Sequence, residues 1–187
     1  EHAVQAVAPF FARFFPNVPV LAIAIRNDSQ KTDWDALYAE LAPLAGTGTL
    51  IVQSTDFSHF LSATEARKFD QESLRVLASL DARLALELNQ PRHVDSRGAL
   101  YLQMRLQKEV CGADPLVLAN RNSQEYAPSP VAKTTSYLVA LYSPTFLTVL
   151  TPTTWILAGD TFFGRHMARR LSNPSRGPAI LEAAKSL

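Results

Sequence analysis

The stretch that decides the fold is Ser54-Thr55-Asp56-Phe57-Ser58-His59-Phe60. It follows the apolar run Leu50-Ile51-Val52, which is short enough to be a buried strand. Ser62 and Glu65 come next at the spacing of a capping box, and this spacing predicts the start of a helix. The order of strand, polar loop and helix is typical of an α/β sheet, in which ligands are usually held at the carboxyl ends of strands.

The loop carries a carboxylate and an imidazole three positions apart, Asp56 and His59. Such a pair can share a proton, or its members can orient each other around a metal. The alternative is structural: Asp56 caps the turn, and His59 is a packed core histidine with a satisfied ring. Asp70 lies on the helix that follows and can face back toward the loop. His93, in a polar connector, is predicted to be a solvated loop residue.

Composition limits the classes of function. Hydrophobic residues make up 47% of the 187 residues, enough for a large core, and 18 basic and 17 acidic side chains leave a net charge of +1. This balance argues against a nucleic-acid or membrane partner. No apolar run approaches the ~20 residues that span a bilayer, and no cationic signal peptide opens the chain. The single cysteine, Cys111, excludes an internal disulfide framework and predicts a reducing, cytoplasmic location.

Hydrophobic spacing predicts alternating helices and strands around this stretch. Residues 1–15 have helical spacing, but Pro9 predicts that the helix begins there and leaves Glu1 and His2 on an irregular lead-in. Two apolar runs predict central strands that are buried on both faces, at 18–25 and 49–53. The remaining predicted elements are helices at about 32–44, 63–77, 80–88 and 96–111, strands at 115–119 and 134–141, and a polar loop at 120–130.

The composition shifts near residue 145. Residues 145–153 hold four threonines and a proline and are predicted to be a linker. Residues 154–187 then predict either a strand–helix extension of the first sheet or the start of a second domain. Within them, the segment 158–165 resembles the opening motif of capsule-biosynthesis proteins of the metallophosphoesterase-like class.

Four stretches together resemble the Memo family, the protein B component of the AmmeMemoRadiSam system. They match the family's order and approximate spacing over residues 1 to about 143, which defines a Memo-like domain at 1–144. The matching stretches are Glu1-His2-Ala3-Val4-Gln5 with Pro9-Phe10, Ser54 to Phe60, Val110-Cys111-Gly112, and Thr134-Thr135-Ser136-Tyr137.

This resemblance implies a fold similar to the catalytic subunit of class III extradiol dioxygenases: an α/β domain with a central mixed sheet and helices on both faces. It implies a pocket where Cys111 and His59 bind a metal, with Asp56 and His59 in catalytic roles and His2 as a further ligand. Copper or iron is the expected metal, with zinc as a further candidate. The implied partners are an AMMECR-type protein and a radical S-adenosylmethionine protein.

The chain also departs from the family pattern. The family's earlier Pro-His-Ala-Gly and Gly-Pro-Ser-His segments, which supply two histidine ligands, do not occur in this sequence, and Gln5 replaces a carboxylate. The chain opens without methionine, which indicates a processed chain or a fragment lacking the N-terminal part of the domain.

Three functions follow from these observations. The first is a metal-binding, redox-linked Memo-like protein, since a thiolate with imidazole suits soft or borderline metals. The second is a non-catalytic binding module that uses the same cleft for a peptide or small anionic ligand. The third is an extradiol-type dioxygenase acting on an aromatic diol. Structural roles remain the alternatives at single residues: Cys111 as a buried helix-end hydrophobe, and His2 as part of a frayed terminus.

Overall fold

The computed structural model describes residues 2–46, 48–126 and 133–144, with His2 described by its backbone alone. The helices are α1 (His2–Phe14), α2 (Lys31–Leu41), α3 (Ala63–Ser79), α4 (Arg97–Arg105) and the short α5 (Ser123–Tyr126). The 3-10 helix η1 (Ala82–Glu87) and the π-helix η2 (Leu106–Val110) flank α4 in sequence. The strands are β1 (His59–Leu61), β2 (Asp114–Asn122) and β3 (Thr134–Ser143).

The described strands form one sheet in the order β1-β3-β2. Both pairings are antiparallel, with His59 opposite Thr135 and Asp114 opposite Ser143. The combination of helices with this small sheet confirms the α/β class. The parallel pairing that a mixed sheet requires does not occur among the strands that the structure describes.

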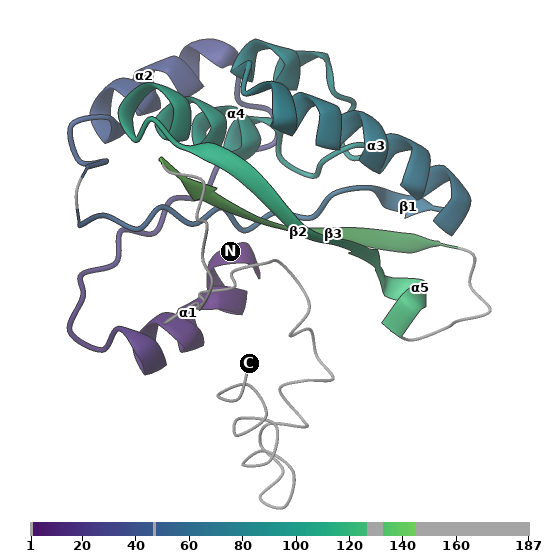
Figure 1. The fold of residues 1–187 in the computed structure, drawn as a ribbon, viewed down its shortest axis with the longest axis horizontal. Coiled ribbons are helices and arrows are strands. Elements are labelled where there is room, and N and C mark those ends of the chain that lie inside the picture. Colours follow the sequence, from purple (N-terminus) through teal and green to yellow (C-terminus); the bar gives the residue numbers. More distant parts are fainter. Residues whose placement is uncertain (1, 47, 127–132, 145–187) are drawn as a thin grey trace, which may run out of the picture.

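Helices cover the sheet in layers (Figure 1). α2, α3 and α4 lie on one side of the sheet, and α1 lies on the other. The core forms on the side of α3 and α4, where the largest fully buried side chains include Leu100, Met104 and Val94. Their enclosure follows from helical periodicity, because Leu100 and Met104 are one turn apart on α4.

Helix ends follow the sequence signals. The Ser62 hydroxyl accepts a hydrogen bond from the Glu65 backbone N–H, and the Glu65 carboxylate accepts one from the Ser62 N–H, so the predicted capping box is confirmed. α3 ends at Leu80, whose φ of 53° lies in the left-handed region. The Ser96 hydroxyl caps α4 by accepting a hydrogen bond from Ala99.

Two predicted strands are wrong. Residues 18–25 and 49–53 are neither helix nor strand, and no described strand pairs with them. Val20 and Leu21 are 59% and 68% exposed. An apolar run forms a central strand only where neighbouring strands bond its backbone groups on both edges. No described strand pairs with either of these segments.

The prediction for the first helix also needs correction. α1 begins at His2 and continues through Pro9 instead of starting there. Proline removes the hydrogen bond to the carbonyl of residue 5, but Gln5 is exposed, so water can bind that carbonyl. The predicted strand at 115–119 is longer than expected, because β2 extends to Asn122 and α5 follows it directly.

The predicted linker at 145–153 and the segment 154–187 lie outside the described residues. Within the described part of the chain, no helix is both long and apolar enough to cross a membrane.

Candidate functional site

Asp56 and His59 form a close pair at the start of β1. The Asp56 Oδ2 and His59 Nε2 atoms are 2.7 Å apart. The side chains are 7% and 16% exposed, so the pair is largely shielded from water. A carboxylate that accepts from one ring nitrogen selects the tautomer with its hydrogen on Nε2 and orients the ring. The contact is one of the arrangements that the sequence left open, and their catalytic roles stay predictions.

Backbone hydrogen bonds hold this segment on both edges. On one edge, Phe57 N donates to Ser136 O at 3.0 Å, and Ser136 N donates to Ser58 O at 2.9 Å. On the other edge, Asp95 N donates to Asp56 O at 2.8 Å. The segment therefore lies between β3 and the connector after η1, which leaves the Asp56–His59 pair on rigid backbone.

Asp70 faces the same segment, as the sequence predicts. Its Oδ1 accepts a hydrogen bond from Ser58 Oγ at 2.7 Å, and its Oδ2 accepts one from Asn120 Nδ2 at 3.1 Å. Asp70 is 2% exposed and Ser58 is fully buried. This network joins α3 and β2 to the loop, so Asp70 has a structural role in supporting the site.

His93 is buried, and the prediction of a solvated loop residue is wrong. Its Nδ1 accepts a hydrogen bond from the Asn89 backbone N–H at 2.9 Å, and its Nε2 lies 2.8 Å from Glu72 Oε2. The ring also packs edge-on against Phe69, at 4.8 Å between centroids. The polar connector folds back on α3, and a polar sequence does not indicate this folding.

Cys111 lies in a different part of the molecule from the Asp56–His59 pair. It follows η2, and its backbone N–H donates to Leu106 O at 3.0 Å, which is the i to i−5 bond of a π-helix. The next residue, Gly112, has a φ of 60°, a conformation that favours glycine. Cys111 lines a cavity of about 480 Å³ that also contacts β3 and residues 49–53.

The two parts of the predicted site are not joined within the described residues. Thr55 and Phe57 line the cavity beside Cys111, whereas Asp56 and His59 do not. Alternation of side chains along an extended backbone accounts for Asp56, which lies between Thr55 and Phe57. It does not account for His59, whose ring contacts Asp56 instead. In the described part of the chain, no group of three or more His, Cys, Asp or Glu side chains is arranged to hold a metal ion. These donors alone therefore do not fit a metal centre, and the metal ligands Cys111, His59 and His2 stay predictions.

Sequence reasoning missed the polar groups of this cavity. Gln103 and Gln107 are 6% and 7% exposed and line it together with Tyr142. Burial raises the pKa of the Tyr142 hydroxyl. A signal was present in the sequence, because Gln103, Gln107 and Cys111 recur every four residues on a helix whose other inward positions are apolar.

The fold and the site define a mixed α/β protein with a buried carboxylate–imidazole pair on a loop beside its sheet. Over 133 residues, the chain is 28% identical to a MEMO1 family protein of Methanosarcina acetivorans. This similarity supports membership of the Memo family. The match covers 69% of this chain and 44% of the relative, so the chain spans less than half the length of the curated relative it matches. No family model matches the sequence, and no solved structure matches the fold.

Proposed function

We propose that this chain is a Memo-like, metal-binding and redox-linked protein of the AmmeMemoRadiSam system. The observation that carries the proposal is the 2.7 Å contact between Asp56 Oδ2 and His59 Nε2 in a segment that is held on both edges. Similarity to the MEMO1 family protein supports it at the level of the family. The reaction itself is left open.

Among the described residues, Asp56 and His59 are arranged for proton transfer. With the Nε2 hydrogen directed at Asp56, a neutral His59 carries its lone pair on Nδ1, and the carboxylate stabilises the ring if it gains a proton. Carboxylates orient metal-binding histidines in the same way. Because the described donors do not complete a metal centre, no step is assigned to a metal. In the proposal, Cys111 is the soft ligand, with His59 and His2 as the imidazole ligands that the family resemblance implies.

The test is metal analysis of the protein as expressed from its own gene. We expect stoichiometric copper, iron or zinc in the wild type, and loss of at least half of that metal in Cys111→Ser and in His59→Asn. Gln71→Leu is the control, because Gln71 is exposed on α3. Absence of stoichiometric metal, with Cys111→Ser indistinguishable from the wild type, would falsify the proposal.

The two alternative functions would give different results with the same purified protein. Oxygen uptake with a catechol would favour an extradiol-type dioxygenase over a redox carrier. Binding of a peptide or small anion without any metal would favour the non-catalytic module. Partners are tested by co-purification with an AMMECR-type protein and a radical S-adenosylmethionine protein, which we expect to be retained by the wild type.

A further inference from the structure

The cavity beside Cys111 holds buried polar groups that have no partner in the protein. Gln53 Nε2 and Tyr142 Oη are inaccessible to solvent and form no hydrogen bond within the described residues. Gln103 and Gln107, which are more than nine-tenths buried, line the same cavity. An unpaired buried amide or hydroxyl costs about 1–3 kcal/mol, so the two inaccessible groups, Gln53 Nε2 and Tyr142 Oη, call for a ligand or water.

One wall of the cavity is helical, and three of its side chains face the space that a ligand would occupy. Gln103, Gln107 and Cys111 are spaced by four residues, which aligns them along one face as α4 passes into the π-helix η2. A π-helical turn costs hydrogen-bond quality and occurs frequently at functional sites. Here it contains Gln107 and ends at Cys111, while Gln103 lies on the preceding turn of α4, so it sets how these side chains face the cavity.

The other residues that line the cavity restrict the charge and the size of a ligand. Among the described residues that line the cavity, none carries a charge, and Leu50, Val52, Phe57 and Leu138 provide apolar surface. A charged ligand would be buried there without a counter-charge, which is costly. The volume of about 480 Å³ lies within the range of small-molecule pockets.

We infer that this cavity binds an uncharged, planar ligand with adjacent hydrogen-bond donor and acceptor groups, such as an aromatic carboxamide or a nucleobase. A glutamine amide presents a donor beside an acceptor and pairs with such an edge through two hydrogen bonds. In this inference the glutamines of the helical wall pair with this edge, Gln53 and Tyr142 offer further hydrogen-bonding groups, and the apolar side chains of the lining contact the ring. The inference goes beyond the proposed function and requires no metal.

The test uses nicotinamide and adenine as probes and nicotinate as the charged counterpart of nicotinamide. We expect isothermal titration calorimetry on the 187-residue chain to detect nicotinamide or adenine, and nicotinate to bind at least tenfold more weakly. Gln107→Leu should weaken binding of the neutral probe about tenfold, since it removes a paired donor and acceptor. Gln71→Leu, a glutamine exposed on α3, should leave the affinity unchanged.

Folding is checked separately by circular dichroism, and Gln107→Leu should melt at or above the wild-type temperature because it replaces a buried amide with an apolar side chain. Cys111→Ser should retain the neutral probe, which separates this inference from the metal proposal. The inference is overturned if neither neutral probe binds, if nicotinate binds equally well, or if a folded Gln107→Leu binds like the wild type. The first result would indicate a cavity occupied by water alone. The other two would indicate binding that does not use the glutamine amides.

Discussion

Two groups of polar side chains in the described residues differ in how they are paired. Ser58 and Asn120 both donate to Asp70, whereas Gln103 and Gln107 face the cavity. The first group stabilises the fold, because each buried donor meets an acceptor. The second group contributes little stability and is therefore the better indicator of binding.

Asp70→Ala is expected to destabilise the protein by about 2–4 kcal/mol, because it removes the charge-assisted hydrogen bonds from Ser58 and Asn120 and leaves these donors only their longer contacts with Ala66 O and Tyr137 O. Urea unfolding followed by circular dichroism measures this loss. Asp28→Ala is the control, since Asp28 is exposed beside Arg26, and it should cost less than about 0.5 kcal/mol. An equal loss in the two variants would contradict a supporting role for Asp70.

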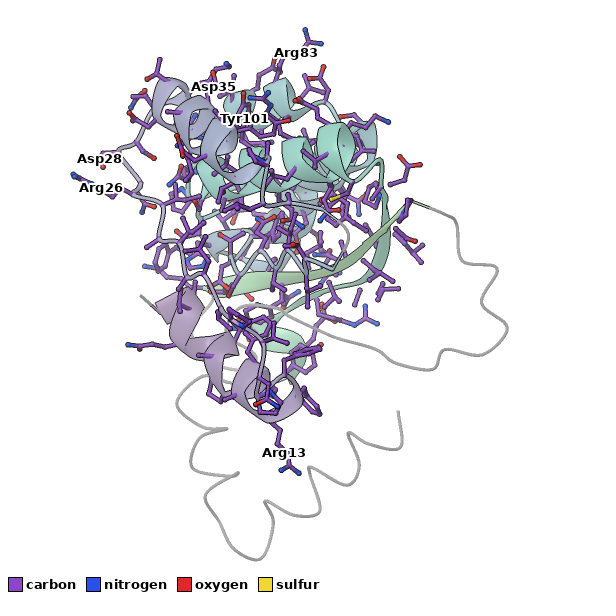
Figure 2. All side chains as sticks on the ribbon, turned by 90° about the vertical axis from the view of Figure 1, so that its left-hand side faces the viewer. Arg13, Arg26, Asp28, Asp35, Arg83 and Tyr101 are labelled. Atoms are coloured by element: carbon purple, nitrogen blue, oxygen red, sulfur yellow. The ribbon has the colours of Figure 1, made fainter. Side chains whose placement is uncertain are left out.

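At the scale of elements, α2 and α4 pack through one small residue. Gly98 lies on α4 where an added Cβ would come within 2.6 Å of Trp34 Nε1 and 2.8 Å of Ile25 Cγ2. Trp34 is held in place by its own hydrogen bond to Ser29 Oγ, at 2.7 Å. The same two helices are joined by Tyr101 and Asp35, whose oxygens are 2.6 Å apart and which lie close together in Figure 2.

Gly98→Ala is therefore expected to be destabilising. Alanine favours a helix by about 1 kcal/mol over glycine, but overpacking against a fixed Trp34 costs about 1–3 kcal/mol and outweighs this gain. The midpoint of thermal unfolding should fall accordingly. Gly46→Ala serves as the matched control, because nothing lies within 4 Å of a Cβ added there and its φ is not left-handed. A Gly98→Ala variant as stable as Gly46→Ala would refute this packing.

At the scale of the whole molecule, apolar surface remains open along residues 18–25 and 49–53. Leu21 and Leu50 are 68% and 53% exposed, and β2 adds Leu116 at 49%. Contiguous apolar surface of this kind marks an interaction site or an aggregation liability. Nothing in the structure identifies what covers it.

Stability should decrease in acid. The Arg105 side chain holds the pKa of Glu109 below its usual value of 4.5, and Lys31, with Tyr101, holds the pKa of Asp35 below 3.8. A hydrogen bond from Ser62 likewise lowers the pKa of Glu65. Carboxyl groups with a lowered pKa in the folded state stabilise it above their unfolded values, and this contribution is lost as pH falls through the folded values.

We therefore expect the free energy of unfolding to be nearly constant between about pH 7 and 5 and to decrease steadily below about pH 4. Urea titrations at pH 7, 5, 4 and 3 measure this change. Glu109→Gln should reduce the decrease slightly, since exposed pairs contribute less than about 1 kcal/mol each. A free energy that rises on acidification would show that these ion pairs do not stabilise the fold.

Local signals in the sequence were sufficient for the start of α3 and indicated one possible pairing in the site. The capping box of Ser62 and Glu65 predicted the start of α3, and the spacing of Asp56 and His59 allowed the contact that the structure shows. Such features depend on neighbours within four residues, so a sequence contains nearly all the information about them. The strand at 134–141 was also predicted, because its β-branched and aromatic residues favour pleated backbone.

The sequence by itself determined the α/β class, the presence of α2, α3 and α4 and the start of α3 at its capping box. Only the tertiary structure decided that 18–25 and 49–53 stay outside the sheet, that His93 is buried, and that Cys111 shares a cavity with two glutamines instead of with His59. The physical reason is that strand pairing and burial depend on partners distant in sequence, whereas helix capping and i to i+3 contacts are completed locally.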